Sequence, residues 1–587
     1  MPSSHWSTMP NHQKVGVYDD LREDLQDHCR TYTTYTIEAW YPSQIVLQKT
    51  IERAKKFVAK LYQLLHLLVV DKVRLEGGQV EQQEKLLNAK DAATLLNPSI
   101  DGKKLEGRLT LALLFAVIAV TIGGSFQFGY HIGNVNAPAD LINNWHNESH
   151  INSTGEVLEK KDADFQWSIA VGIFAVGGMA GGLLSGWLAD KMGRKGALLF
   201  NNLFAFIAAA FLSFAKRSDV FHFITIGRLV IGFCCGLSSG LVPMYLTEVS
   251  PINLRGTLGS VHQLMVTISI LFAQILGLRE LLGNDSYWPL IFAFTLVPAI
   301  FQLLTLPLCP ESPKYNLIVK ANIDQAERDL KKLRGKDDVS QELDLIKDEA
   351  SVAQNQPKTG ILDMFGPTLR WPLTIAIMMM LSQQFSGINA AMFYSTTIFR
   401  RAGLTGDMPI YATIAMGAIN VAQTIVSLWL VDHPKFGRRS LHLTGLIGML
   451  ISSLLIVISM ILANPDKDGV PERQWASYLS ILFVLTFVIS FATGPGSIPW
   501  FFVSEIFPSS ARGSANSIAV MANWTANFIV GVSFLPINNL LGQYTFLVFV
   551  ALLAFFIFFT YKFVPETKGK TVEEINRELS RNSRNRT

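Results

Sequence analysis

The chain has 587 residues, of which 49% are hydrophobic and only 16% are charged. A soluble globular protein carries about 25% charged residues, and a soluble chain of this length would need such a fraction to cover several domains. The net charge of +4 is too small and too scattered to indicate nucleic-acid binding. Four cysteines are too few for a disulfide scaffold. The composition therefore predicts a membrane protein that crosses the bilayer many times.

Residues 1–106 differ in character from the rest of the chain. They are polar, mix both charge signs and contain no apolar run long enough to span a bilayer. No apolar segment follows Met1 to mark a signal peptide. The stretch 43–75 has the periodicity of a basic amphipathic helix, which can bind a membrane surface. We expect instead a cytoplasmic extension that is partner-bound or partly disordered.

From Leu109 onward, apolar stretches of about 20 residues alternate with polar joints, and this length crosses the ~30 Å of hydrocarbon in a bilayer. Twelve spans are predicted, at 109–133, 167–189, 197–215, 221–243, 261–279, 288–308, 372–399, 409–431, 441–463, 477–500, 514–535 and 545–564. The joint that follows the sixth span has the pattern of short amphipathic helices, for example over 324–333. The predicted organisation is an extension (1–106), a six-helix half (107–308), a helical linker (309–371), a second six-helix half (372–566) and a tail (567–587).

Basic residues gather in alternate joints, around 191–195, 331–334 and 435–439. The positive-inside rule makes this side cytoplasmic and, with twelve spans, predicts that both termini are cytoplasmic. Arg400 and Arg401 are exceptions on the opposite side. The glycosylation sequons at Asn147 and Asn152 follow the first span, so they are predicted to lie outside and to carry glycans.

Three motifs occur twice, in the same order relative to the spans. The charged string at 190–195 after the second span matches 432–439 after the eighth. Glu248 is followed by Arg-Gly seven residues later, and Glu505 repeats that spacing after the tenth span. Pro-Glu ends the sixth span at 310–311 and the twelfth at 565–566. Two similar halves of six helices imply a cavity at their interface, which is typical of a transporter.

The repeated charges also predict a gate. A carboxylate and a guanidinium at the cytoplasmic ends of neighbouring spans can pair across the two halves, close the inner mouth and separate when it opens. Ordinary positive-inside anchoring is the alternative, and the repetition favours the gate. The predicted gate residues are Arg194, Arg228, Glu248, Arg255, Arg438, Arg439, Glu505 and Arg512.

Uncharged amides inside apolar spans are costly unless they are paired, and several occur here. An amide both donates and accepts hydrogen bonds, as the hydroxyls of a hexose do. Gly387 lies between two of these amides and permits a local helix break, and Trp500 can cover the apolar face of a pyranose ring. Hydrogen bonding between helices is the alternative. The candidate ligand-binding amides are Gln263, Gln383, Gln384, Asn389, Asn420 and Asn523.

Several strings are more specific than these patterns. They are Gln-Phe-Gly-Tyr at 127–130, Gly-Arg-Lys at 193–195, Pro-Glu-Ser-Pro at 310–313, Gln-Gln-Phe-Ser-Gly-Ile-Asn at 383–389, Gly-Pro-Gly-Ser-Ile-Pro-Trp at 494–500 and Pro-Glu-Thr-Lys-Gly at 565–569. With them, residues 105–576 resemble the sugar porters of the major facilitator superfamily and, within these, the animal facilitative glucose transporters. The first 100 residues or so have no counterpart in this pattern.

The resemblance implies an all-α membrane protein with twelve transmembrane helices in two six-helix pseudo-repeats and a cytoplasmic helical linker between them. It implies facilitated diffusion of glucose and related hexoses across the plasma membrane by alternating access, without covalent chemistry or cofactor. Neither a nucleotide-binding loop nor a metal-ligand spacing occurs in the sequence. The resemblance assigns sugar binding to Gln263, Gln383, Gln384, Asn389, Asn420, Trp500 and Asn523.

The chain departs from the family pattern at His131, where glucose carriers usually have Asn and proton-coupled sugar porters have an acidic residue. A histidine can titrate near neutral pH, which makes His131 a candidate proton-sensitive group. We expect a neutral hydrogen-bonding role, because no carboxylate accompanies His131 in the first span. Proton–sugar symport and a sugar sensor that does not transport therefore remain as alternatives, and the intact motifs of both halves disfavour the sensor.

Overall fold

The computed structural model describes residues 107–579, with gaps at 137, 252–253, 356–359, 405, 434, 464–471, 508, 569, 571–573 and 576. The amphipathic segment expected within 43–75 lies outside the described residues. The described helices form two halves with a helical linker between them in the chain.

The first half follows the expected order of six spans. Its helices are α2 (Leu111–Val120), η2 (Thr121–Ser125), α3 (Phe126–Gly133), α4 (Ala139–Thr154), α5 (Lys160–Met192), α6 (Arg194–Ser218), α7 (His222–Val249), α8 (Arg255–Leu276), α9 (Trp288–Ala293) and α10 (Leu296–Thr305). The first span is continuous through α2, the π-helical turn η2 and α3. Thr110 caps it, because its Oγ1 accepts a hydrogen bond of 3.1 Å from the backbone N of Leu113.

The second half repeats this order. Its helices are α14 (Arg370–Phe385), α15 (Ile388–Arg401), α16 (Met408–Asp432), α17 (Arg438–Ala463), α18 (Gln474–Thr493), α19 (Ile498–Ile506), α20 (Ser509–Leu541) and α21 (Phe546–Phe563). Within the described residues, 11 helical segments are long and apolar enough to cross a membrane. They correspond to every predicted span except 372–399.

That remaining span is broken at Gly387, the position where the sequence permits a local break. Gly387 has φ +92, a left-handed conformation that residues with a Cβ rarely adopt. A Cβ at this position would also lie only 2.7 Å from the ring of Phe549. The break divides the span into α14 and α15, each too short to cross the bilayer alone. Together they complete the expected set of twelve spans.

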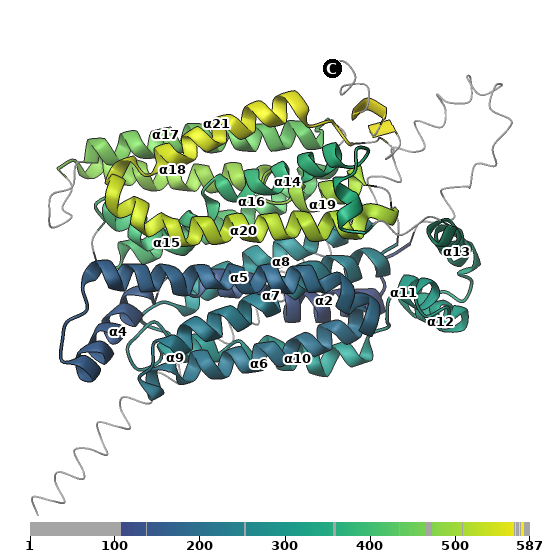
Figure 1. The fold of residues 1–587 in the computed structure, drawn as a ribbon, viewed down its shortest axis with the longest axis horizontal. Coiled ribbons are helices and arrows are strands. Elements are labelled where there is room, and N and C mark those ends of the chain that lie inside the picture. Colours follow the sequence, from purple (N-terminus) through teal and green to yellow (C-terminus); the bar gives the residue numbers. More distant parts are fainter. Residues whose placement is uncertain are drawn as a thin grey trace, which may run out of the picture. The chain divides into compact units, whose positions relative to one another are not determined.

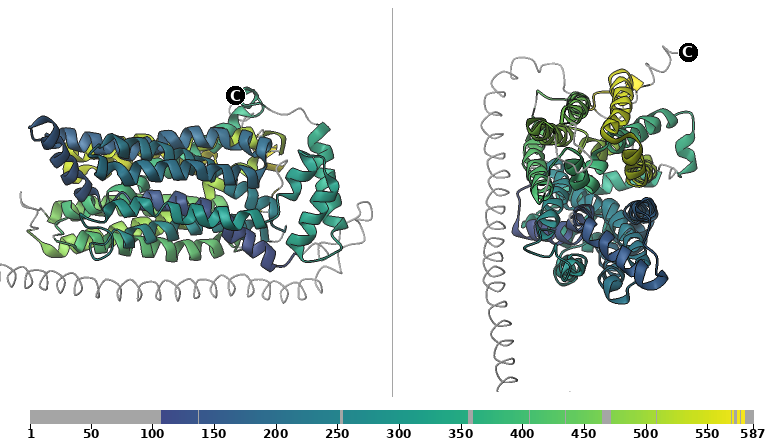
Figure 2. Two further views of the ribbon diagram at one scale, coloured as in Figure 1. Left: turned by 90° about the horizontal axis from the view of Figure 1, so that it is seen from below. Right: turned by 90° about the vertical axis from the view of Figure 1, so that its left-hand side faces the viewer.

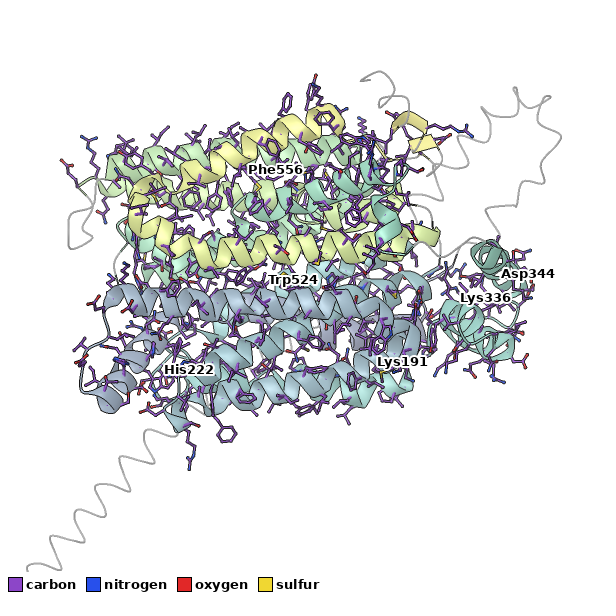
Figure 3. All side chains as sticks on the ribbon, in the orientation of Figure 1. Lys191, His222, Lys336, Asp344, Trp524 and Phe556 are labelled. Atoms are coloured by element: carbon purple, nitrogen blue, oxygen red, sulfur yellow. The ribbon has the colours of Figure 1, made fainter. Side chains whose placement is uncertain are left out.

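The two halves contact each other along α5 and α20 and along α8 and α16 (Figure 1). Glycines on α5 make the first contact close: a Cβ on Gly178 would lie 2.5 Å from the Trp524 side chain on α20. Figure 3 shows Trp524 at this boundary. Its indole packs on Phe128 and Phe174 of the first half, with ring centroids 5.3 Å and 5.5 Å apart. Small residues thus let the helices pack closely where the hydrophobic effect offers no force between them.

The two ends of the bundle are distinguished by what covers them. At one end, which we call the linker end, lie α11 (Pro313–Ile318), α12 (Ile323–Arg334) and α13 (Ser340–Asn355), and α12 confirms the helix expected over 324–333 (Figures 1 and 2). The linker is fixed by hydrogen bonds from Thr110 Oγ1 to the Leu333 carbonyl (2.7 Å) and from Arg334 Nη1 to the Val249 carbonyl (2.8 Å). The opposite end carries α4, and we call it the α4 end (Figure 1).

Helix α4 docks on the start of α9 and on the residues that join α6 to α7. Trp145 is buried and packs on Trp288, with ring centroids 5.5 Å apart. The His146 ring stacks on Phe221 at 3.8 Å, and the Ser149 hydroxyl donates to the Asp219 carbonyl at 3.0 Å. Burial, together with the nearby His150 and His222, lowers the pKa of His146 to about 4. The docked helix therefore favours the neutral imidazole.

This shift predicts that acid loosens α4. Because the folded pKa lies below the ordinary value of 6.5, the docking free energy is complete above pH ~6.5 and is lost as the pH falls toward 4. We expect the backbone of 139–154 to exchange hydrogen faster at pH 5 than at pH 7.5, after correction for the intrinsic rate. His146→Phe keeps an aromatic stack but cannot titrate, so its protection should not change with pH. The same pH dependence in both proteins would contradict this account.

Candidate functional site

Four of the predicted amides form one hydrogen-bonded cluster in the second half. Gln384 Nε2 donates to Asn523 Oδ1 at 2.9 Å and to Gln383 Oε1 at 3.3 Å. Asn523 Nδ2 donates to Gln383 Oε1 at 2.8 Å, and Asn389 Nδ2 donates to Gln384 Oε1. All four side chains are buried. We call Gln383, Gln384, Asn389 and Asn523 the amide cluster.

The amide cluster depends on two helix breaks. The break at Gly387 brings Asn389 back toward Gln384, which lies five residues earlier on the preceding helix. A second break separates α18 from α19 at 494–497, and its free carbonyls accept hydrogen bonds from Gln383 Nε2. The acceptors are the carbonyls of Pro495 and Gly496, both at 2.9 Å. Broken helices thus expose backbone groups that side-chain amides satisfy, and this fixes the amides in space.

The other predicted sugar-binding residues lie outside this hydrogen-bonded cluster. Gln263 is half-buried on α8, and Asn420 is buried on α16. Asn420 Oδ1 has no hydrogen-bond partner among the described residues. Trp500, half-buried on α19, packs against two hydrophobic clusters of the protein. The resemblance assigned Gln263, Asn420 and Trp500 to the same sugar site as the amide cluster. No hydrogen bond among the described residues links these three side chains to the cluster.

His131 lies in the first half and makes two side-chain hydrogen bonds. Its Nε2 is 3.0 Å from Thr295 Oγ1, and its Nδ1 is 3.2 Å from Asn134 Nδ2. A neutral imidazole satisfies both, with Nδ1 accepting from the amide and Nε2 donating to the hydroxyl. The His131 carbonyl accepts a 2.7 Å hydrogen bond from Arg228 Nη1. The geometry therefore supports the neutral hydrogen-bonding role expected for His131.

Arg228 is not part of a gate at the linker end. It lies six residues after His222, which Figure 3 shows at the α4 end, and about 30 Å along α7 from Glu248. The side chain is fully buried, with its guanidinium 4.4 Å from the Phe174 ring centroid and 3.4 Å from the Val171 carbonyl. The prediction that Arg228 belongs to the gate is therefore wrong: in the predicted span 221–243, Arg228 already lies near the end opposite Glu248.

A strong ion pair joins two helices of the first half at the linker end. Arg194 donates from Nε and Nη2 to the two oxygens of Glu248, at 2.8 Å and 2.9 Å. Their side chains are only 11% and 14% exposed, so solvent screens the pair weakly. The Ser312 hydroxyl also donates to Glu248, and Asp190 lies 3.4 Å from Arg194. Such a bidentate arrangement is strong and directional.

The second half contains the corresponding pair in a looser form. Arg438 Nε is 3.5 Å from Glu505 Oε1, and the Glu505 side chain is 28% exposed. The Thr567 hydroxyl donates to Glu505, as Ser312 does to Glu248 in the first half. The sequence repeat is thus also a repeat of contacts.

A second carboxylate in each half caps the helix that follows the charged string. Glu311 accepts from the backbone N of Lys195 at 3.1 Å, and Glu566 accepts from the backbone N of Arg438 at 2.7 Å. Burial raises the pKa of Glu311, and the backbone hydrogen bonds that it accepts oppose this rise. Negative charge at a helix N-terminus is stabilising, so these carboxylates fix the starts of α6 and α17.

These contacts correct one expectation about the gate. The sequence predicted that the charges pair across the two halves, but Arg194–Glu248 and Arg438–Glu505 each lie within one half. The reason is that each arginine begins a helix whose neighbour in the same half ends beside it, so the nearest carboxylate is local. The pairs therefore fix the linker-end geometry of each half.

The remaining predicted gate residues also contact their own half where they are described. Arg439 donates to the Tyr561 carbonyl, and its guanidinium lies 5.5 Å from the Tyr561 ring centroid. Arg512 Nη2 lies 3.4 Å from the Phe507 carbonyl. The side chain of Arg255 lies outside the described residues.

Polar contacts do cross between the halves at the α4 end, and the sequence analysis missed them. Arg400 pairs with Asp140, and Arg279 Nη1 is 3.5 Å from Asp407 Oδ1. Asn539 of the second half donates from Nδ2 to Asp164 Oδ2 of the first half at 2.9 Å, and it accepts a 2.7 Å hydrogen bond from Arg401 Nη2 of its own half. The signal was present, because Arg400 and Arg401 were the exceptions to the positive-inside pattern.

A buried hydrogen-bond group accompanies these ion pairs. Asn136, just beyond α3, donates to Ser395 Oγ and, at 3.2 Å, to the Met392 carbonyl on α15. Its Oδ1 accepts from Thr396 Oγ1 at 2.8 Å. The two halves are thus joined by polar groups at the α4 end in this structure.

Comparison with known proteins agrees with this architecture. Residues 116–579 match the family described as "Sugar (and other) transporter". The chain belongs to this sugar transporter family. It is 58% identical over 497 residues to facilitated glucose transporter protein 1 of Caenorhabditis elegans, covering 84% of this chain and 96% of that protein. It is 44% identical over 475 residues to solute carrier family 2, facilitated glucose transporter member 1 of Gallus gallus, covering 81% and 94%.

Solved structures place this sugar transporter in the major facilitator superfamily. The proton:xylose symporter XylE bound to 6-bromo-6-deoxy-D-glucose superposes with a TM-score of 0.66 and 25% identity, covering 80% of this chain and 100% of that one. The partially occluded inward open XylE from E. coli gives a TM-score of 0.64 and 26% identity, covering 79% and 100%. The amide cluster and the charged pairs thus belong to a sugar transporter that crosses the membrane many times.

The unequal ion pairs of this sugar transporter predict unequal effects on stability. Glu248→Gln removes a bidentate, nearly buried pair and leaves Arg194 without its main partner, so we expect a loss of about 3 kcal/mol. Glu505→Gln breaks a longer and more exposed contact and should cost about 1 kcal/mol. Thermal unfolding of both purified variants in detergent measures the difference. Equal losses, or a larger loss for Glu505→Gln, would show that the geometry of the pairs does not determine their strength.

Proposed function

We propose that this chain transports glucose and related hexoses by facilitated diffusion, exposing one site alternately to the two sides of the membrane. The amide cluster is the observation that carries the proposal. Four buried amides, held by two helix breaks, offer both donors and acceptors in a chain whose close relatives are named facilitated glucose transporters. The hydroxyls of a hexose both donate and accept hydrogen bonds, so they need acceptors and donors in the site.

Sugar hydroxyls replace hydrogen bonds that the amides make with one another. The four amides of the cluster pair with one another when no sugar is bound, so the cluster itself leaves no buried amide atom unpaired. Binding exchanges these bonds for bonds to the sugar, which keeps the affinity moderate and lets the sugar leave. Trp500, beyond the break that Gln383 fixes, covers the apolar face of the ring. Gln263 and Asn420 complete the site from α8 and α16. No bond of the sugar is made or broken, so the chain acts as a carrier and not as an enzyme.

The two ends of the bundle serve as alternate gates. At the α4 end the halves are joined by Arg400–Asp140 and by the hydrogen bonds of Asn136, which must break for that end to open. At the linker end, the Arg194–Glu248 and Arg438–Glu505 pairs keep each half rigid while the halves rotate. The linker end lies on the cytoplasmic side of the plasma membrane, and both termini lie on the same side. The basic residues at this end favour that orientation, because basic residues gather on the cytoplasmic side of membrane proteins.

Of the two sequons predicted to lie outside the cell, the one at Asn152 is the better glycan acceptor. Asn152 and Thr154 of its sequon are exposed on α4. Ser149, the hydroxyl residue of the other sequon, is buried against Asp219, and Asn147 Oδ1 accepts from the backbone N of Leu158 at 3.0 Å. A glycan on Asn147 would disturb this docking.

The environment of His131 favours uniport over proton–sugar symport. Both ring nitrogens are engaged with neutral groups, Thr295 and Asn134, and no described ion pair joins His131 to a carboxylate. Coupling to protons needs a group that changes its charge as the sugar binds. A histidine whose two ring nitrogens are hydrogen-bonded in the neutral form is not expected to take up a proton when the sugar binds.

Uptake of radiolabelled glucose into proteoliposomes tests the proposal. We expect saturable uptake that stops at equilibrium and does not respond to an imposed proton gradient. Gln384→Leu removes about 2 kcal/mol of hydrogen bonding and should lower kcat/KM roughly 30-fold. Gln423→Leu is the matched control, because Gln423 donates to Thr493 Oγ1 at 2.9 Å and lies outside the amide cluster.

Each other outcome contradicts a different part of the proposal. Accumulation above equilibrium that collapses with the proton gradient would make the chain a symporter, with His131 as the coupling group. Glucose binding without uptake would indicate a sensor. Equal uptake by Gln384→Leu and Gln423→Leu would remove the amide cluster from the sugar site.

A further inference from the structure

Gln274 on α8 is a fully buried glutamine whose amide makes no hydrogen bond to any described residue. Its side chain is 0% exposed, and neither Oε1 nor Nε2 has a partner among the described residues. The carbonyl oxygen lies against α16 of the other half, where a Cβ on Gly417 would come within 2.1 Å of it. An amide with both polar atoms unpaired therefore sits in the contact between the two halves.

Gln274 shares a helix face with a residue of the proposed sugar site. It follows Gln263 by eleven residues, which is about three full turns, so both side chains project from the same face about 16 Å apart. On the facing helix, Gly417 lies three residues from Asn420, whose Oδ1 is also unpaired among the described residues. The two facing surfaces thus continue the polar lining of the site beyond the amide cluster.

This polar lining leads toward the α4 end. Gln274 lies near the end of α8, five residues before Arg279, and Arg279 pairs with Asp407 at the start of α16. On α16, Thr413 is one turn closer to that end than Gly417, and its hydroxyl is 2.8 Å from Ser395 Oγ. Gln274 is therefore between Asn420 and the contacts that join the halves at the α4 end.

The unpaired amide is costly in the described state. Burying a polar group without a hydrogen bond is unfavourable, and a leucine of similar size would not incur this cost. The cost disappears when the halves part at this level and the amide meets a polar molecule. In a chain that carries hexoses, a sugar hydroxyl passing between α8 and α16 is such a group.

We propose that Gln274 is a second sugar-contact position, which binds a hydroxyl of the hexose on its way between the central site and the α4 end. This inference rests on the proposed hexose transport and adds a residue to its path. It assigns two roles to one side chain: Gln274 destabilises the state in which the α4 end is closed, and it lowers the barrier to the sugar's passage when that end is open.

The variant Gln274→Leu tests whether Gln274 has these two roles or only fills space between the helices. Removing the unpaired amide should raise the temperature of thermal unfolding, while kcat/KM for glucose uptake falls about tenfold. Gln302→Leu is the matched control, since Gln302 is also fully buried in the first half but accepts a 2.8 Å hydrogen bond from Asn202 Nδ2. This control should unfold at a lower temperature and keep its kcat/KM per folded molecule.

A series of deoxyglucoses identifies the sugar contact. If Gln274 binds one hydroxyl, Gln274→Leu should lower kcat/KM much less for the deoxyglucose that lacks that hydroxyl than for glucose. A loss of the same size for every sugar would overturn the proposal, because it would mean that Gln274 acts only on the conformational change. Unchanged glucose uptake by Gln274→Leu would also overturn it, whatever happens to the unfolding temperature.

The wild-type protein separates failure of this inference from failure of the proposed function. Saturable glucose uptake by the wild type, with unchanged uptake by Gln274→Leu, would overturn the role of Gln274 alone. Absence of wild-type uptake would overturn glucose transport and, with it, the second contact.

Discussion

Inside a bilayer no water replaces a lost hydrogen bond, so every polar group of the spans needs a partner within the protein. This constraint organises the second half of the molecule. The helix breaks at Gly387 and at 494–497 expose backbone carbonyls, and Gln383 satisfies two of them. The cluster that results holds the remaining amides ready for a ligand that can exchange hydrogen bonds with them. Gln274 and Asn420 are among the residues with a buried polar atom that has no partner among the described residues, and both lie on the facing surfaces of α8 and α16.

The charged groups divide into two kinds with different tasks. At the linker end, each half uses an arginine, a glutamate and a hydroxyl residue to fix its own helix ends, and the two sets of contacts repeat each other. At the α4 end, ion pairs and hydrogen bonds join one half to the other. Two rigid halves joined by separable contacts at one end form a device with two discrete arrangements, as alternating exposure of one site requires.

Much of this was predictable because membrane-spanning segments must follow the thickness of the bilayer. The length of the apolar stretches predicted the spans, and the repeated motifs predicted the two halves. A glycine between two amides permitted the break at Gly387, since residues with a Cβ rarely adopt its backbone conformation. The cluster of Gln383, Gln384 and Asn389 followed from that break, because the three residues are neighbours in the chain. Asn523 joins them from α20, a contact that only packing could establish.

The sequence by itself determined the class of protein, the number and order of its spans, the repeat, and the residue types available for a sugar site. Only the tertiary structure decided which charges meet, because a guanidinium pairs with the carboxylate nearest in space. Arg194 and Arg438 therefore pair within their halves, and Arg400 pairs between them. The contacts of Arg228 with the His131 carbonyl and the Phe174 ring, and the absence of a partner for Gln274 among the described residues, were likewise decided by packing. Both depend on how neighbouring helices are aligned, which the pattern along one chain does not contain.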